Sequence, residues 1–496
     1  MKTLRDVDVA QRRAAMGMLS ALGLVAVTSC VTDSDPGTRE AEIASALTGT
    51  TFNWVDNLAG LRAMAHATTA PVVVVEGYGS AGDGGGGIFL WNNTSTLADN
   101  DGTIVRPNHV AAASPGRWIR LYTGPVNVRW FGAGLGLGSD LARIMSALAV
   151  LTATGGELFF PAANYFLSGP IDITSNNITV RGESPFGSRL AGSGAFDTIR
   201  VLGSLSNPLT AVHLKNLYFL EGGKTAGNSI LIEYSSQCLI VDCQMESPSS
   251  GVRLHSVNTI EFERVRIAGP TGANSYGFWI TGDAAAATDV VTFKNVVVQG
   301  NTGTAHSTHG LIVDGRVNTL SAYKLYLNEM DGAGLWFRNT MGSADPEFAT
   351  FYGLEIERPF FEAVQIAVGN RFYFTDAQLF GSATRTNVTI AAPVTSVSFS
   401  GGWSRDAAGS GFDVSGQQVS INAVDVEGNN GAGIQLNGTS RVVSVVGNKV
   451  RSNPTAISIA AGADQFTVVG NTCFANAKID NAAGTGASRI VTGNTR

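Results

Sequence analysis

The chain has 496 residues, a formal net charge of −6, and only 15% charged residues. Sixty glycines together with so few charges are typical of an all-β protein with many tight turns, and they argue against a helical protein of this length. Because there is no general excess of positive charge, nucleic acid is excluded as an expected partner.

Residues 1–29 have the pattern of an export signal, because a basic segment precedes an apolar run that is too short to cross a bilayer comfortably. The run ends in Val27-Thr28-Ser29-Cys30, which resembles a bacterial lipobox. We therefore predict that Cys30 is lipidated and that the protein is anchored at the outer membrane or cell surface. The alternative is an ordinary signal peptide with a chance cysteine. Residues 30–50 are polar and are predicted to be a flexible tether.

Residues 51–123 are predicted to form a small β-rich domain. A short helix is expected over residues 57–65, and β-strands are expected at 72–75, 88–91, 103–105 and 118–121. The glycine run Gly82–Gly87 could be a phosphate-binding loop, but no Lys-Ser/Thr follows it and it does not open a helix. We therefore predict a hairpin loop there.

The main body, residues 124–496, begins with a predicted amphipathic helix over about residues 139–152. Ser139 or Asp140 can cap its N-terminus. An amphipathic helix at this point would cover the open end of a solenoid, whose coils are expected over about residues 157–496.

Four motifs lie around this helix: Gly77–Gly87, Gly116–Trp118, Asn127–Ala133 and Phe159–Ala162. They resemble motifs of the pectate-lyase-like superfamily of phage tailspikes and related bacterial proteins. The resemblance implies a β-helix but no particular activity, because lyases, hydrolases, epimerases and inert proteins share this coil. Family members usually carry a Gly-Asp-Gly turn and paired aspartates before the cap helix, whereas this chain keeps only Asp140.

Successive coils are predicted from residue 170 onward, with outer strands at variable spacing. These strands are expected at 178–180, 214–217, 239–243, 264–267, 293–296, 323–327, 354–357, 374–379, 397–399 and 424–427.

The end of the chain repeats with a period of 23 residues. Val445-Val446-Gly447-Asn448 recurs as Val468-Val469-Gly470-Asn471 and, with one change, as Val491-Thr492-Gly493-Asn494. Such a period, with short β-branched strands and Gly/Asn turns, indicates a parallel β-helix in which like residues stack about 4.8 Å apart. The stacked asparagines are expected to form ladders of paired side-chain amides, and Asn453 and Asn476 repeat at the same spacing.

Alternation along the predicted strands places carboxylates on the outside of the solenoid. Leu354 and Ile356 would face inward, so Glu355 and Glu357 face outward, as does Asp376 on the next strand. Carboxylates at these positions would lie about 5 to 7 Å apart, which brackets the separations of retaining and inverting glycosidases. Crowded like charges would also raise one pKa and produce an acid. We predict that Glu355, Glu357 and Asp376 are catalytic; the alternative is a solvated charged face.

Four neighbouring outward side chains are predicted to bind substrate: Arg264, Arg266, Lys324 and Tyr326. The resemblance adds a second chemistry, because lyases of this superfamily often use Arg or Lys to abstract the proton beside a uronate carboxylate, with calcium on nearby aspartates. Arg264, Arg266 and Lys324 are candidates for that base, and calcium would then be a cofactor; otherwise no cofactor is expected. A solvated sheet face is again the alternative.

Two further pairs of residues invite a functional reading. His306 and His309 could share a metal ion, but no third ligand is evident, so a surface loop and no metal site are expected. Trp336 and Phe337 could form a platform for a sugar, but we expect both to pack inside.

These patterns predict an exported, all-β lipoprotein: a right-handed parallel β-helix with an N-terminal capping helix and a small N-terminal β-rich domain. Its predicted activity is cleavage of an extracellular polysaccharide, by a glycoside hydrolase or polysaccharide lyase mechanism, in a groove along the solenoid. The alternative is a non-catalytic glycan-binding, structural or adhesion protein, including a domesticated tailspike-like protein. The expected partners are a polysaccharide and, through the lipid, a membrane; a monomer and a homotrimer are both open.

Overall fold

The computed structural model describes residues 53–64, 72–301, 308–474 and 478–495. The chain divides into two compact units: the smaller runs to Leu137 and includes Ala142–Val150, and the larger holds Gly138–Leu141 and everything from Leu151. The predicted signal, the tether and Cys30 lie outside the described residues. No described helix has the length and apolar character needed to cross a bilayer.

The smaller unit contains a five-stranded sheet in the order β1-β2-β3-β5-β4, parallel between β1 and β2 and otherwise antiparallel. Helix α3 (Leu58–Ala63) packs its leucines into the core with Trp118. The predicted helix and strands are thus confirmed, and Gly82–Gly87 lies in the hairpin connecting β2 and β3. The strands are β1 (Asn53–Val55), β2 (Val72–Val75), β3 (Gly87–Asn92), β4 (Ile104–Val105) and β5 (Arg117–Leu121).

Strand β6 (Val126–Asn127) and the 3-10 helix η1 (Val128–Phe131) lead into helix α4 (Leu141–Ala149). The predicted amphipathic helix is therefore present, with Ile144 and Leu148 buried. Its role as a cap on the solenoid remains a prediction.

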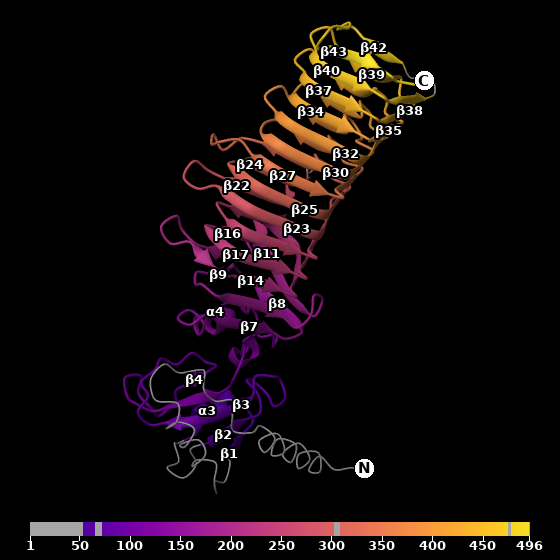
Figure 1. Ribbon diagram of the computed structural model, residues 1–496. Helices are drawn as coiled ribbons and strands as arrows, with labels where there is room; N and C mark the ends of the chain where they lie inside the picture. Colours follow the sequence, from indigo (N-terminus) through magenta and orange to yellow (C-terminus); the bar gives the residue numbers. More distant parts are fainter. Residues whose placement is uncertain (1–52, 65–71, 302–307, 475–477, 496) are drawn as a thin grey trace, which may run out of the picture. The chain divides into compact units, whose positions relative to one another are not determined.

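The larger unit is a parallel β-helix, as predicted (Figure 1). Each coil contributes to three ladders. The strands of one ladder form a 13-stranded sheet in the described part of the chain. They are β9 (Ile171–Ile173), β12 (Ile199–Leu202), β16 (Asn228–Glu233), β19 (Ser250–His255), β22 (Tyr276–Gly282), β24 (His309–Gly315), β26 (Leu335–Arg338), β29 (Val364–Ile366), β31 (Val388–Ile390), β33 (Phe412–Val414), β36 (Ala432–Leu436), β39 (Thr455–Ile459) and β42 (Ile479–Asn481).

The other two ladders belong to one larger sheet, and we call them the first and second ladder in chain order within a coil. The first ladder contains β7 (Gly156–Phe160), β10 (Ile178–Gly182), β13 (Leu209–Thr210), β14 (His213–Lys215), β17 (Ser235–Val241), β20 (Asn258–Glu263), β27 (Glu347–Tyr352), β34 (Gln417–Asn422), β37 (Arg441–Val446), β40 (Asp464–Val469) and β43 (Arg489–Thr492). The second ladder contains β8 (Ala163–Leu167), β11 (Ser188–Ala195), β15 (Tyr218–Ala226), β18 (Gln244–Glu246), β21 (Arg266–Ala268), β28 (Glu355–Glu357), β35 (Asp425–Glu427), β38 (Lys449–Arg451) and β41 (Thr472–Phe474). Four long strands run through both: β23 (Thr288–Gln299), β25 (Val317–Asn328), β30 (Asn370–Phe380) and β32 (Thr395–Arg405).

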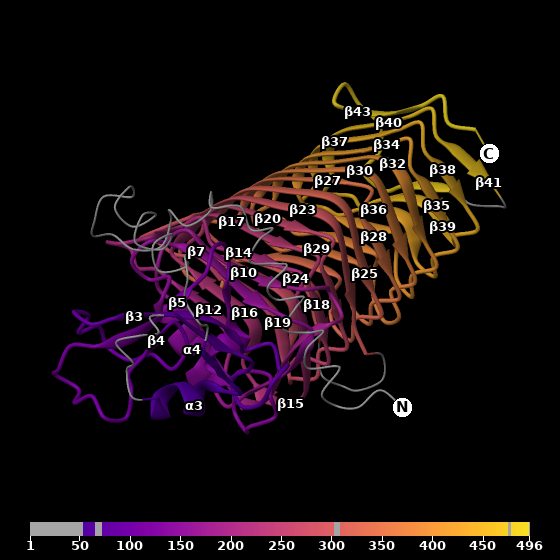
Figure 2. The same ribbon diagram turned by 90° about the horizontal axis from the view of Figure 1, so that it is seen from below.

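The repeated segments at the end of the chain lie directly over one another, as predicted. Val445 pairs with Val468, and Val468 pairs with Val491. Figure 2 shows β34, β37 and β40 side by side along the solenoid. Inside the coils, identical side chains also stack: Phe374 lies between Phe351 and Phe399, with ring centroids 5.0 and 4.3 Å away.

A single residue in the left-handed region forms the corner between the first and second ladders. Its φ is 53° at Asn295 and 57° at Lys324, and glycine takes the same place at Gly353 and Gly401. Because the chain turns at this residue, even where one long strand such as β25 or β30 runs through it, side chains on either side of the corner do not follow one continuous alternation. This corner decides where several predicted site residues lie.

Candidate functional site

Two of the predicted catalytic residues lie together on the outer surface of strand β28. Glu355 and Glu357 are partly buried, and Ile356 between them is fully buried, as alternation predicted. In the second ladder, Glu355 is flanked by Tyr326 on the preceding coil and Gln378 on the following one. Both carboxylates therefore face outward from one strand.

The two glutamates have different electrostatic environments. The hydroxyl of Tyr326 donates a hydrogen bond to Oε2 of Glu357 over 2.9 Å. Burial, and then this bond, raise the pKa of Tyr326 to about 12, so the phenol stays protonated and remains a donor. Partial burial, and then the charge of Glu357, raise the pKa of Glu355. A carboxyl with a raised pKa, beside one that accepts a hydrogen bond, is an arrangement suited to a general acid and its partner base.

Aromatic side chains extend this surface along the second ladder. Trp403 follows Gln378 in the row of Glu355, and Phe380 and Arg405 continue the row of Glu357. The rings of Phe380 and Trp403 meet edge to face with centroids 6.1 Å apart, and the guanidinium of Arg405 lies 5.0 Å from the Trp403 ring. Aromatic rings beside hydrogen-bonding groups match the mixed apolar and hydroxylated surface of a sugar.

The third predicted catalytic residue, Asp376, is not part of this pair. It occupies the left-handed corner between the ladders, with a φ of 53°, inside the long strand β30, so it does not lie in the second-ladder row of Glu355. The residue that lies beside Glu355 is Gln378, two positions later. The second-ladder rows therefore hold two of the three predicted carboxylates, and Asp376 lies at the corner.

Two of the predicted substrate-binding residues, Arg264 and Lys324, also occupy corners. Arg264 contacts both carboxylate oxygens of Asp242, over 2.7 and 2.9 Å, and also binds Glu263. Asp242 raises the pKa of Arg264, which disfavours this arginine as a proton-abstracting base. Lys324 lines a shallow pocket of about 440 Å³ together with Lys294, Asn295 and Tyr323.

The other two, Arg266 and Tyr326, share a row of the second ladder, with Val297 between them. Arg266 donates a hydrogen bond to Gln299 over 2.8 Å and lies 3.7 Å from the carboxylate of Glu246. The structure therefore brings Tyr326 into contact with the glutamate pair, whereas Arg266 lies further along the same face.

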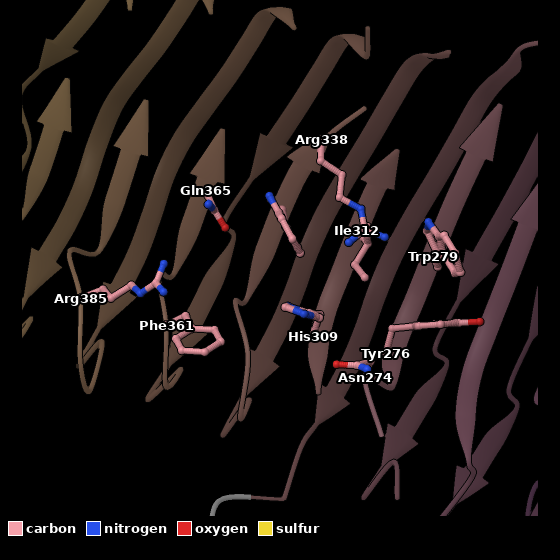
Figure 3. A pocket seen from close by; sticks show the side chains of 10 residues that line it. Asn274, Tyr276, Trp279, His309, Ile312, Arg338, Phe361, Gln365 and Arg385 are labelled. Atoms are coloured by element: carbon pink, nitrogen blue, oxygen red, sulfur yellow. The ribbon is translucent and has the colours of Figure 1, made fainter. Parts of the chain in front are cut away.

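A groove on the outer face of the 13-stranded sheet is a second candidate site (Figure 3). Its side chains come from strands β22, β24, β26 and β29 and from the loops beside them. Its volume is about 510 Å³, within the range of small-molecule sites. It is lined by Asn274, Tyr276, Trp279, His309, Ile312, Trp336, Arg338, Phe361, Gln365 and Arg385.

Arg338 lies in the middle of this groove, where Figure 3 shows it extending over Ile312. Its Nε donates to Oδ2 of Asp314 over 2.8 Å, and Asp314 is fully buried. The guanidinium carbon lies 4.5 Å from the ring centroid of Trp336 and 5.5 Å from that of Trp279. The buried carboxylate and the two indoles therefore hold the guanidinium in one place.

Trp336 thus lines the outside of the solenoid, and the expectation that it packs inside is wrong. Its neighbour Phe337 is fully buried, as predicted. His309 also lines the groove; its Nδ1 accepts a hydrogen bond from the amide of Ala333 over 3.0 Å, and burial lowers its pKa to about 4. His306 lies outside the described residues. Within the described ranges, no three His, Cys, Asp or Glu side chains gather closely enough to hold a metal ion.

The family and structure comparisons agree with this architecture. The family model of the phage tail protein small four-stranded beta-sheet domain matches residues 55–123. Tailspike protein 3 of bacteriophage CBA120 is 11% identical, with a TM-score of 0.53, and the match covers 90% of this chain and 78% of that one. The surface protein and adhesin PfbA of Streptococcus pneumoniae is 11% identical with a TM-score of 0.52, covering 72% and 98%.

The fold is that of the tailspike-like β-helices. The predicted resemblance is confirmed for the fold only, because sequence identities of 11% show the fold and nothing further. Tailspike protein 2 from the Escherichia coli O157:H7 bacteriophage CAB120 is 15% identical with a TM-score of 0.44; the match covers 89% of this chain but only 54% of that chain. The chain thus spans about half the length of this tailspike. A search of curated proteins found no match.

The groove was not predicted from the sequence, because the predicted outer strands belong to the first and second ladders. A usable signal was present in Phe278-Trp279-Ile280 and Leu335-Trp336-Phe337. In each, one tryptophan stands between two apolar residues of a short strand, so burying both neighbours turns the indole outward. These tryptophans reach one groove because their coils stack. The coils in this part of the chain differ in length, so no fixed sequence period reveals the contact.

Proposed function

We propose that this protein binds a polysaccharide outside the cell and cleaves a glycosidic bond at Glu355 and Glu357. The observation that carries this proposal is the unequal glutamate pair on the solenoid surface: the pKa of Glu355 is raised, and Glu357 accepts a hydrogen bond from Tyr326. The polymer would lie across the coils, along the rows of aromatic and amide side chains that continue from the pair.

In the proposed reaction, Glu355 donates its proton to the glycosidic oxygen as the bond to the anomeric carbon breaks. Glu357, oriented by Tyr326, then acts as the base that activates water or as the nucleophile, and the stereochemistry of the product distinguishes the two. Arg264, one of the three candidates for the lyase base, is disfavoured in that role because Asp242 holds it as a cation.

A second candidate function is glycan binding without cleavage, and the groove favours it. Its lining combines aromatic, amide and cationic side chains. The two carboxylates behind it are already ion-paired: Asp314 pairs with Arg338, and Glu362 pairs with Arg385 at 3.2 Å. PfbA, which shares the fold, is named as an adhesin, whereas the phage proteins are named as tailspikes.

The site of action is proposed to be the cell surface, through lipidation of Cys30 and a tether that separates the lipid from the folded units. This placement would bring the solenoid into contact with capsular or matrix polysaccharides. A phage-tail-like domain of about 70 residues next to the tether is compatible with presentation on a surface.

The test is a panel of neutral and acidic polysaccharides incubated with the mature protein, with new reducing ends and absorbance from unsaturated uronates followed together. Reducing ends without the absorbance are expected. Glu355→Gln and Glu357→Gln should each lower the rate by at least roughly a hundredfold, the scale of general acid–base catalysis. Glu246→Gln is the matched control, because Glu246 occupies the row of Glu357 on an earlier coil and should leave the rate unchanged.

Cleavage at this site would be contradicted if the Glu355→Gln and Glu357→Gln variants both kept their activity. Binding without any new reducing ends would instead establish the second candidate function.

A further inference from the structure

We propose that the groove on the 13-stranded sheet is a separate binding site for a carboxylate-bearing sugar, with Arg338 as the group that recognises the carboxylate. The site rests on the proposed function only in that its ligand is part of a polysaccharide. It lies on a different sheet from Glu355 and Glu357, so holding the polymer and cutting it would involve two different faces of the solenoid.

The first reason is the fixed position of the guanidinium. Asp314 accepts hydrogen bonds from Arg338 Nε over 2.8 Å, from the amide of Thr340 over 2.7 Å and from its hydroxyl over 2.6 Å. The carboxylate is therefore fully satisfied behind the groove. In the described part of the chain, the Arg338 side chain donates its hydrogen bond from Nε, to Asp314. The buried side of the arginine is anchored, while its outer donors remain available to a ligand.

The second reason is the charge of the groove. None of the described side chains that line it is acidic, whereas Arg338 and Arg385 both line it. The partner of Arg385 is Glu362, whose side chain is only 7% exposed. Arg253 contributes a further cation next to the lining, with its guanidinium 4.8 Å from the Trp279 ring. Because the carboxylates are covered and the guanidiniums are accessible, an anionic group is favoured over a cationic one.

The third reason is the mixture of apolar and hydrogen-bonding surfaces around the cation. Trp336 and Phe361 offer aromatic surface, and Asn274 and Gln365 offer amides that can both donate and accept hydrogen bonds. His309 is neutral above its pKa of about 4; with Nδ1 accepting from Ala333, its Nε2 carries the proton and can donate to a ligand. A bare inorganic anion would leave these amides and rings unused, whereas a uronic acid ring presents a carboxylate, hydroxyls and an apolar face together.

The experiment measures binding to the full mature protein carrying Glu355→Gln, so that the ligands are not cut. Isothermal titration calorimetry would use hexasaccharides of galacturonate, mannuronate and hyaluronan, each beside its carboxyl-reduced counterpart, and inorganic phosphate. At least one acidic hexasaccharide is expected to bind, with its reduced counterpart roughly tenfold weaker or more. Phosphate is expected to bind weakly or not at all.

Arg338→Lys is the decisive variant, because it keeps a positive charge for buried Asp314 but removes the planar fork. It should weaken binding of the acidic hexasaccharide roughly tenfold, to the affinity of its carboxyl-reduced counterpart. Arg371→Lys is the matched control, since Arg371 pairs with Glu347 on the first ladder and should leave affinity unchanged. Circular dichroism would confirm that both variants are folded, and Gln365→Ala offers a second, milder change in the groove.

Three outcomes would overturn the assignment: no acidic hexasaccharide binds, the acidic and reduced forms bind equally, or Arg338→Lys and Gln365→Ala both bind as tightly as the parent. Phosphate binding as tight as the hexasaccharide would also overturn it, since the site would then be a simple anion site. Failure of the cleavage proposal is distinguishable, because wild-type protein would release no reducing ends while binding in the groove still depended on Arg338.

Discussion

The environment that suits Glu355 to its proposed role also lowers the stability of the folded protein. Its pKa is raised by partial burial and by the neighbouring charge of Glu357, so the folded state binds this proton more tightly than the unfolded state does. At neutral pH, where both states are ionised, the folded protein therefore carries an unfavourable interaction. Groups tuned for catalysis commonly lower stability in this way.

Glu355→Gln is therefore expected to stabilise the protein while abolishing cleavage. Since the carboxyl is largely solvated, the gain at pH 7 should be modest, about 0.5 kcal/mol. It should disappear as the pH falls below the ordinary glutamate pKa of 4.5, where the native glutamate is protonated in both states. Thermal midpoints measured at both pH values would test this. Glu246→Gln should give no gain, and a loss of stability at pH 7 in Glu355→Gln would contradict the interpretation.

At the scale of an element, the asparagine ladder shows how side-chain amides support a turn alongside its backbone hydrogen bonds. Asn471 is fully buried; its Oδ1 accepts from the backbone and side-chain amides of Asn448, over 3.0 and 2.9 Å. Its Nδ2 donates to Val445 and to Asn494, both over 2.9 Å. The predicted ladder is therefore confirmed for this series. The second predicted series runs from Asn453 toward Asn429, while Asn476 lies outside the described residues.

Asn471→Ala should leave several buried backbone and side-chain groups without partners and cost about 3 kcal/mol. Because each coil of a solenoid contacts only its neighbours, the loss is expected to stay local. Amide hydrogen exchange should accelerate in the last coils and remain unchanged around Glu355. Asn494→Ala, at the less buried end of the ladder, should have a smaller effect. Uniform acceleration across the solenoid would rule out this local picture.

At the scale of the molecule, the solenoid places two chemically different surfaces on the same coils. Strands β26, β27, β28 and β29 follow one another in the chain; the first and last contribute to the groove, and β28 carries the glutamate pair. The thirteen coils in the described part of the chain make, at strand spacing, an assembly roughly 60 Å long, enough for many sugar residues. A polymer held in the groove would remain close to the proposed cleavage face.

Cell-surface placement gives a prediction for the whole chain. If Cys30 is lipidated, cells fed a labelled fatty acid should incorporate the label into the wild-type protein and into Cys473→Ser, but not into Cys30→Ser. Cys473 is the matched control because it is buried inside the solenoid. The Cys30→Ser protein should also leave the membrane fraction. Labelled Cys30→Ser protein, or an unlabelled wild type, would contradict lipid anchoring.

The sequence by itself determined the repeating architecture. The 23-residue period and the aligned asparagines depend on contacts between equivalent positions, and such contacts are visible in the chain as repetition. The outward direction of Glu355 and Glu357 could be predicted as well, since it needs only the alternation within one strand.

Only the tertiary structure decided which residues meet. Asp376, Arg264 and Lys324 are themselves the left-handed residues at corners, so they lie outside the second-ladder rows that contain Glu355 and Glu357. Because the loops differ in length, the sequence did not reveal the register that brings Trp279, Trp336 and Arg338 to one groove. The direction of a side chain is a local property of its strand, whereas its neighbours on other coils depend on how much chain each coil takes to close.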